Sequence, residues 1–315
     1  MVKSLPLFLL LFLTACNDGK APASVSEVAV QGIYSGCLSE DGQYALIGSI
    51  HHGGSYWQTS KKERLYDWNH KSGEKTGILF CAISADQKFA ATSDARQIAL
   101  WNTQNGQAVW LWEAPAEIRA MAINQQGNIA LLGMNNYEAA VFDIQNGGVL
   151  RKLRHEGVVQ AVAISHDSQL AVTGGDDSLM RVWELKTGKM LFEQRLDNQI
   201  KAVAISPDNK QVFASSYLGK SYVWDVSSQK VISEIVKSSG HYISARFSAN
   251  SSQLLTGTAS GLIQLWDLPG GKEKMRWQAT PLNPWSAIKT QVLDVAFAQG
   301  AYWAIGANGR LYKFQ

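Results

Sequence analysis

The chain contains little proline, little cysteine and little charge. Its 315 residues include 7 Pro and 3 Cys, and charged residues make up 17% of the total. The low proline content and the 46% of hydrophobic residues exclude a collagen-like or disordered chain. The 29 basic and 26 acidic residues nearly balance, and no long run of one sign occurs, which excludes a nucleic-acid-binding role.

The apolar stretch Leu5–Leu13 is too short to cross a membrane as a helix, which needs about 20 residues. It follows Lys3 and precedes the small residues Thr14 and Ala15, so residues 1–15 have the pattern of a secretory signal. The motif Leu13-Thr14-Ala15-Cys16 resembles the lipobox of bacterial lipoproteins, which implies that Cys16 is acylated and begins the mature chain. The alternative is an ordinary cleavage site that happens to contain a cysteine.

Residues 16–23 are then the lipidated cysteine and a flexible tether, rich in small and polar residues. In lipoproteins of enteric bacteria, aspartate directly after the acylated cysteine favours the inner membrane, whereas this chain has Asn17 there. By this resemblance we expect a protein anchored in the bacterial envelope and facing the periplasm. The outer membrane is favoured over the inner membrane.

Residues 24–315 repeat one pattern seven times. An apolar segment ends at a small polar residue, and after a turn two further segments lead to an aromatic residue. The first of these anchors are Ser39, Ser84, Asn124, Ser165, Ser206, Ser248 and Ala298, and the aromatic anchors are Trp68, Trp101, Phe142, Trp183, Trp224, Trp266 and Phe314. Within the copies apolar and polar residues alternate with a period of two, which indicates strands.

A period of 40–45 residues ending in Trp-Asp, as at Trp224-Asp225 and Trp266-Asp267, resembles the WD40 repeat. The resemblance implies an all-β, seven-bladed β-propeller over residues 24–315. The last copy stops at Phe314, after its third strand, whereas Ser24–Val30 supplies a spare strand before the first copy. We therefore expect the N-terminal strand to complete the C-terminal blade, which would close the ring.

The fourth copy matches the family pattern most fully. In that family a histidine, a hydroxyl residue, an aspartate and the aromatic anchor form a structural hydrogen-bonded group. The resemblance assigns these places to His155, Thr173, Asp177 and Trp183.

Two insertions interrupt the regular spacing, and both are expected on the top face of the propeller. One lies near residues 51–65 of blade 1, and the other near residues 279–290, before blade 7. They supply the candidate partner-binding residues Tyr56, Trp57, Arg64 and Trp285, because aromatic and arginine side chains are enriched in interaction hot spots. The alternative is that these loops cover the channel or each other. The outer strand of blade 1 is expected to be abbreviated.

Two cysteines remain beyond Cys16. Cys37 and Cys81 lie on the first strands of adjacent blades, one position apart in repeat register, so they point to opposite faces of their strands. A disulfide across the blade interface is possible, but we expect two buried free thiols, because disulfide geometry is demanding. His51, His52 and His70 lack the spacing of a zinc site, and neither a metal nor another cofactor is predicted.

The common nucleophile and metalloenzyme motifs Gly-x-Ser-x-Gly, His-Glu-x-x-His and Cys-x-x-Cys are absent from the sequence. We therefore expect a monomeric, membrane-anchored scaffold that binds envelope proteins and is not an enzyme. The alternative function is a propeller enzyme or a binder of a small ligand, such as a glycan or a quinone, at the top face or in the central channel.

Overall fold

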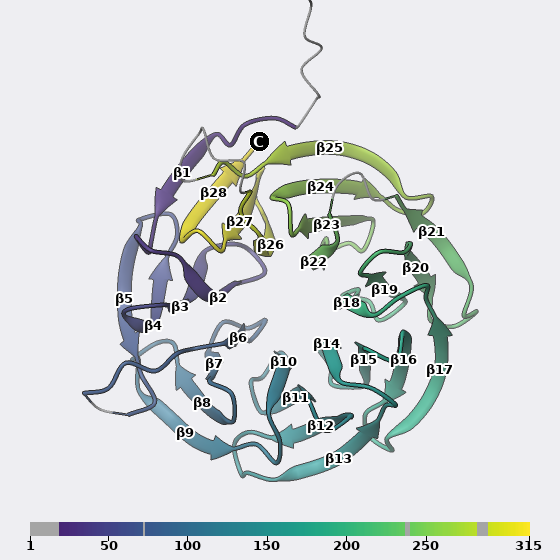
Figure 1. The fold of residues 1–315 in the computed structure, drawn as a ribbon, viewed down its shortest axis with the longest axis horizontal. Helices are drawn as coiled ribbons and strands as arrows, with labels where there is room; N and C mark the ends of the chain where they lie inside the picture. The colour runs from purple at the N-terminus through teal and green to yellow at the C-terminus, as the bar shows by residue number, and fades with distance from the viewer. Residues whose placement is uncertain (1–18, 72, 237–239, 282–288) are drawn as a thin grey trace, which may run out of the picture.

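The computed structural model describes residues 19–71, 73–236, 240–281 and 289–315. Within these ranges the chain forms 28 strands and no helix, and the strands make seven four-stranded antiparallel sheets. The sheets stand as blades around a central axis (Figure 1), so the expected all-β, seven-bladed propeller is confirmed. No helix in the described ranges is long and apolar enough to span a membrane.

The first four blades each take four consecutive strands, ordered from the channel outward. Blade 1 contains β2 (Ile33–Leu38), β3 (Tyr44–Ser49), β4 (Gly53–Gln58) and β5 (Glu63–Trp68). Blade 2 contains β6 (Phe80–Ile83), β7 (Phe89–Ser93), β8 (Gln97–Asn102) and β9 (Ala108–Glu113). Blade 3 contains β10 (Ile118–Ile123), β11 (Ile129–Met134), β12 (Glu138–Asp143) and β13 (Val149–Arg154). Blade 4 contains β14 (Val159–Ile164), β15 (Leu170–Gly175), β16 (Leu179–Glu184) and β17 (Lys189–Arg195).

The last three blades complete the ring. Blade 5 contains β18 (Ile200–Ile205), β19 (Gln211–Ser216), β20 (Ser221–Asp225) and β21 (Val231–Ile235). Blade 6 contains β22 (Tyr242–Phe247), β23 (Gln253–Thr258), β24 (Leu262–Asp267) and β25 (Lys272–Gln278). Blade 7 contains β26 (Val292–Ala298), β27 (Ala301–Gly306), β28 (Arg310–Phe314) and, as its outer strand, β1 (Ser24–Glu27).

The ring closes as the sequence predicts. Strand β1 pairs antiparallel with β28, with Val25 opposite Tyr312 and Glu27 opposite Arg310. The first strand of the propeller therefore forms the outer edge of its last blade. This pairing supplies the fourth strand that the C-terminal repeat lacks.

The serine anchors close the turn between the first and second strands of their blades. In blade 4 the Ser165 hydroxyl donates to Asp167 (2.7 Å) and accepts from the backbone N–H of Leu170 (2.9 Å). Between these residues Ser168 takes a left-handed conformation, with φ of 59°. The same Ser-x-Asp arrangement recurs after β2, β6 and β18. Serine is thus favoured at this position by the turn.

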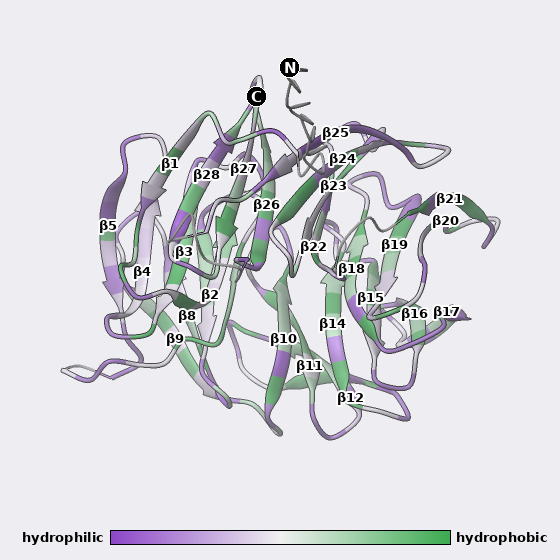
Figure 2. Ribbon diagram, turned by 45° about the horizontal axis from the view of Figure 1, so that its top comes forward, coloured by the Kyte–Doolittle hydropathy of each residue, from purple (hydrophilic) through white to green (hydrophobic). Residues whose placement is uncertain are grey.

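The core lies between blades, where the apolar faces of neighbouring sheets meet. Trp183 of blade 4 packs in one buried cluster with Leu131 and Val141 of blade 3. In Figure 2 hydrophobic residues follow the strands, and hydrophilic residues are frequent in the turns and on outer strands such as β5 and β25. Each blade is therefore stabilised mainly by its two neighbours.

Blade 1 differs from the predicted register. Trp57 lies opposite Ala45, as Trp183 lies opposite Ala171 in blade 4, so Trp57 is the aromatic anchor of the third strand. Trp68 instead ends the outer strand β5, which is full length. The predicted insertion at residues 51–65 and the abbreviated outer strand are both wrong, because this segment forms β4, a hairpin and β5. The extra residues lie between β5 and β6, in 69–79.

The predicted tether is already bound to the propeller at Lys20. The backbone N–H of Lys20 donates to the carbonyl of Arg276 (3.0 Å), and its carbonyl accepts from Gln278 (3.0 Å), so it extends the edge of β25. The N–H of Ala23 then donates to the carbonyl of Lys313 (2.8 Å). The expectation of a free tether through residue 23 is therefore wrong from Lys20 onward. Residues 1–18, with the predicted signal and Cys16, lie outside the described ranges.

The expectation of two free thiols is also wrong, because Cys37 and Cys81 form a disulfide with their Cα atoms 6.0 Å apart. Cys37 lies on β2 and Cys81 on β6, the innermost strands of blades 1 and 2. The one-position offset turns the two side chains toward opposite faces of their strands. Because β2 and β6 belong to neighbouring blades, the face of β2 that carries Cys37 lies against the face of β6 that carries Cys81.

Replacing both Cys37 and Cys81 with alanine is expected to lower the free energy of unfolding by about 4 kcal/mol, the loop-entropy value for a bridge of this sequence separation. Urea unfolding of the wild type and the double variant measures the difference. Thiol titration of unreduced, denatured protein in a Cys16→Ser background provides the control. Two reactive thiols in that titration would contradict the bridge.

Candidate functional site

The structure joins His155, Thr173, Asp177 and Trp183 of blade 4 in one chain of hydrogen bonds, as the resemblance implies. The Nδ1 of His155 lies 3.0 Å from Oδ2 of Asp177, and its Nε2 lies 2.7 Å from Oγ1 of Thr173. The Trp183 indole N–H donates to the same Oγ1 (2.8 Å). Since Asp177 accepts the Nδ1 proton, Nε2 accepts the Thr173 hydroxyl proton, and all four side chains are satisfied.

This group connects three segments of blade 4 and has a structural role in holding them together. It has the connectivity of a catalytic triad, in which a carboxylate orients a histidine beside a hydroxyl nucleophile. The Thr173 side chain, however, is completely buried, and its hydroxyl already accepts a hydrogen bond from Trp183. A substrate cannot reach this oxygen, so the group stabilises the blade.

Asp177 is ionised in this setting. Burial opposes its ionisation, but hydrogen bonds from His155 and from the backbone of Glu156 and Leu179 outweigh burial and hold the pKa of Asp177 far below its ordinary value. The guanidinium of Arg181 lies 2.7 Å from the same carboxylate. Asp177 therefore carries a buried negative charge, which the guanidinium of Arg181 compensates and the hydrogen bond from His155 stabilises.

Blade 2 contains a partial copy of the group, which the sequence did not reveal. His70 Nε2 lies 2.9 Å from Thr92 Oγ1, which accepts the Trp101 indole N–H (2.7 Å). The aspartate position holds Ala95, and among the described residues the Nδ1 of His70 has no hydrogen-bond partner. His70 lies fourteen residues before Ser84, whereas His155 lies ten before Ser165, so the longer loop hid the equivalence.

His70 is thus a packing residue of blade 2 rather than part of a histidine cluster. Within the described ranges no group of three or more His, Cys, Asp and Glu side chains is placed to hold a metal ion. His51 and His52 lie in the exposed turn between β3 and β4.

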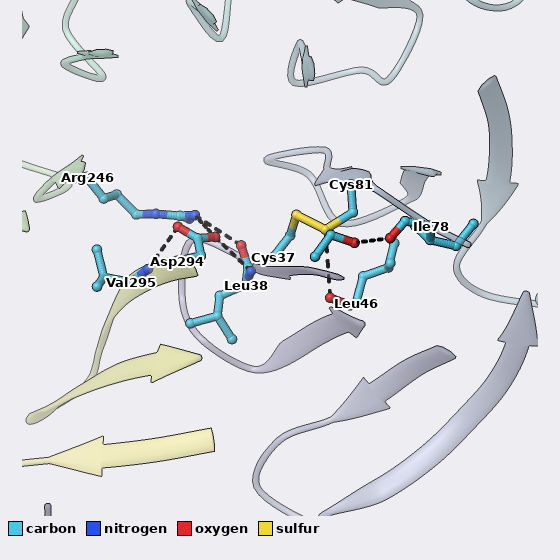
Figure 3. Close-up of a disulfide and its surroundings, with 9 residues drawn as sticks. Cys37, Leu38, Leu46, Ile78, Cys81, Arg246, Asp294 and Val295 are labelled. Atoms are coloured by element: carbon cyan, nitrogen blue, oxygen red, sulfur yellow. Dashed lines mark hydrogen bonds and ion pairs between the residues drawn. A yellow bond between two sulfur atoms is a disulfide. The ribbon is translucent and has the colours of Figure 1, made fainter. Parts of the chain in front are cut away.

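The channel contains a cavity of about 820 Å³, which is lined by the innermost strands of all seven blades. A clasp in its wall joins blades 6, 7 and 1. Arg246 of β22 donates to Asp294 of β26 (2.9 Å) and to the carbonyl of Leu38 (3.1 Å), while the N–H of Leu38 donates to Asp294 (2.8 Å). Figure 3 shows that Leu38 directly follows the disulfide-bonded Cys37, so β2 is attached to its neighbours on both sides.

One contact spans the channel. Glu40 follows β2 of blade 1 and His166 follows β14 of blade 4, strands that stand on different sides of the opening in Figure 1. Their side chains nevertheless meet, with His166 Nε2 2.6 Å from Glu40 Oε1. The hydrogen bond to Glu40 raises the pKa of His166. Burial opposes ionisation of Glu40, but the hydrogen bond from His166 and the positive charges of Arg246 and His166 together outweigh burial and lower the pKa of Glu40.

The candidate partner-binding residues that the structure describes do not form one exposed loop surface. Tyr56 lies on β4 and is buried, at 1% exposure, in a stack with Tyr44 and Trp68. Trp57 is half-buried on the same strand, and the exposed Arg64 of β5 lies over its ring at 5.5 Å. Their predicted place in a loop is therefore wrong, because they belong to paired strands. Trp285 lies outside the described residues.

Asp177→Asn is expected to lower the free energy of unfolding by about 3 kcal/mol at neutral pH, because it removes one member of a buried charged group. A carboxylate with a lowered pKa stabilises the fold above its unfolded pKa, and this stabilisation fades as the pH falls. The difference between variant and wild type should therefore shrink toward pH 2. Urea unfolding across this range measures it, with the exposed Asp67→Asn as control. A difference that is constant with pH would contradict this role.

The pKa of His166 is expected to lie above its ordinary value of 6.5 in the wild type and to fall toward that value in Glu40→Gln. A raised histidine pKa stabilises the fold below the unfolded pKa, and the contribution is lost as the pH rises through the folded pKa. Because both side chains are partly exposed, the pair contributes at most about 1 kcal/mol. An NMR titration of the histidine rings provides the measurement. Equal pKa values in the two proteins would show that the contact does not persist in solution.

The comparisons with known proteins agree with this architecture. The family model described as WD domain, G-beta repeat, matches residues 147–184 and 233–267. A comparison with curated proteins finds no match. The first matched segment begins in the turn just before the outer strand β13, and the second begins within the outer strand β21. Both end with the third strand of the next blade, at Glu184 and Asp267. The chain thus carries WD40 repeats, arranged in a seven-bladed β-propeller.

Proposed function

We propose that this protein is a lipid-anchored, periplasm-facing scaffold that binds envelope proteins and does not catalyse a reaction. The observation that carries the proposal is the closed seven-bladed ring of WD40 repeats, an architecture whose broad outer surfaces serve protein interaction. Arg246 and His166 in the channel are paired with Asp294 and Glu40, and His155 in blade 4 is paired with Asp177. This arrangement suits a rigid interaction platform.

The disulfide supports the proposed compartment. Bridges of this kind persist in oxidising environments such as the bacterial periplasm and are rare in the cytosol. The Cys37–Cys81 bond lies in the channel wall between two blades, where it holds inner strands together. A periplasmic location would let this bond form during folding.

The N-terminal motif supports the proposed anchor. Acyl chains on Cys16 would bind a bilayer with about 0.8 kcal/mol per buried CH₂ group, and several chains together make a lasting attachment. Lys20 is already paired with β25, and three residues lie between it and Cys16, so the Cα atoms of Cys16 and Lys20 are at most about 14 Å apart. The proposed anchor would therefore hold the edge of blades 6 and 7 close to the membrane. Asn17 favours the outer membrane over the inner membrane.

Cys16→Ser is expected to abolish incorporation of radiolabelled palmitate in bacterial cells, because the proposed acylation requires its thiol. The matched variant Thr14→Ser, which keeps the small residue before the cleavage site, should incorporate label like the wild type. Gel autoradiography of the purified chain measures both. Label in the Cys16 variant, or absence of label from all three proteins, would reject the anchor.

The scaffold function is tested separately by crosslinking intact envelopes and purifying the tagged chain. A reproducible envelope protein supports the scaffold, whereas a small molecule as the sole retained species would favour a ligand-binding propeller that uses its 820 Å³ channel.

A further inference from the structure

The outer strands of blades 2 and 3 are free edges. Strand β9 ends the sheet of blade 2 and β13 ends the sheet of blade 3, so among the described residues each pairs with another strand on one side only. The backbone N–H and C=O groups on the outward side are thus available for pairing with an added strand.

These two edges expose apolar side chains. The exposed residues are Val109, Trp110 and Leu111 of β9, together with Val149 and Leu150 of β13. Trp110 is 45% exposed and Leu150 44% exposed. Outer strands usually carry charges that prevent unwanted pairing, as β25 does with Lys272, Glu273 and Lys274, but β9 has no charged residue before Glu113.

The two strands follow each other around the perimeter (Figure 1), and a direct contact joins them. Gly147, in the turn before β13, lies so close to the ring of Trp112 on β9 that a Cβ there would meet the ring at 2.1 Å. We call the exposed side chains of these two neighbouring strands the rim surface.

The rim surface is positively charged on its β13 side. Arg151, Lys152 and Arg154 lie on this strand, and Glu138 is the one carboxylate within ion-pair distance of them in the described structure, at 3.3 Å from Lys152 and 3.9 Å from Arg154. Arg151 donates to the carbonyls of Leu150 and Lys186 and leaves its charge without a counterion there. Three cations against one carboxylate favour an acidic partner.

We propose that the rim surface binds an extended segment of a partner protein, which adds as a strand to β9 or β13 and presents apolar side chains together with carboxylates. This proposal rests on the scaffold function proposed above and names the chemistry of its partner.

The position of the proposed anchor argues against a lipid as the molecule that binds the rim surface. Lys20 and β1 attach at blades 6 and 7, on the opposite side of the ring from β9 and β13 (Figure 1), so an anchored propeller turns the rim surface away from its own membrane.

The test uses fluorescein-labelled nine-residue peptides and the full-length protein in detergent. One peptide alternates valine and glutamate, a second has lysine for glutamate, and a third repeats the first with alternate backbone nitrogens methylated. Fluorescence anisotropy should show binding of the first peptide, and binding of the other two at least about tenfold weaker, because charge and strand pairing are both required.

Two variants locate the site on the protein. Trp110→Ala should weaken binding of the acidic peptide about tenfold by removing an aromatic contact. Arg154→Glu, at a side chain that is 84% exposed, should weaken it by reversing a charge. Val231→Ala on β21 and Lys274→Glu on β25 are matched controls at outer strands of other blades and should bind like the wild type. Unchanged thermal unfolding shows that every variant is folded.

The proposal is overturned if the acidic peptide does not bind at millimolar concentration, if the lysine peptide binds equally well, or if the controls weaken binding as much as the rim variants. Envelope crosslinking with Trp110→Ala separates this result from the scaffold function. Capture at wild-type level despite a failed peptide test would reject the rim surface and keep the scaffold, whereas no capture by either protein would reject both.

Discussion

Closure of the ring depends on one antiparallel pairing, between the first and last strands of the propeller. Without β1, the outer side of β28 would be an unpaired edge, and blade 7 would lose the strand that completes its sheet. The channel wall strengthens the same joint. Arg246 and Asp294 attach blades 6 and 7 to β2, and the bond from Cys37 to Cys81 continues the connection to blade 2. Four consecutive blades are thus linked beside the pairing of β1 with β28.

The architecture could be predicted because each blade repeats the same requirements. The serine anchors are needed for the turn after the inner strand, and the tryptophans fill the space between blades. The register of blade 1 was mispredicted because Trp57 and Trp68 both lie within the last two residues of strands of that blade, and Trp57 is not followed by aspartate or glutamate. Only the strand pairing distinguishes the two tryptophans, because it places Trp57 opposite Ala45.

The candidate site was predictable only where it obeys the repeat. The hydrogen-bonded group of blade 4 keeps the family spacing, whereas the longer loop before β6 concealed His70. The contact between Glu40 and His166 depends on the width of the channel, which no local sequence pattern records. The disulfide was missed for a related reason, because whether two opposite strand faces meet depends on how the blades are placed around the ring.

The bridge between Cys37 and Cys81 also makes most of blade 1 a closed covalent loop. The hairpin between β4 and β5 lies within that loop and exposes Lys61 and Lys62. A protease that cuts there leaves the two fragments joined through sulfur and still paired through the sheet. The two fragments would remain one covalent molecule until a reductant broke the disulfide. The backbone of this blade can therefore be cut while the ring remains closed.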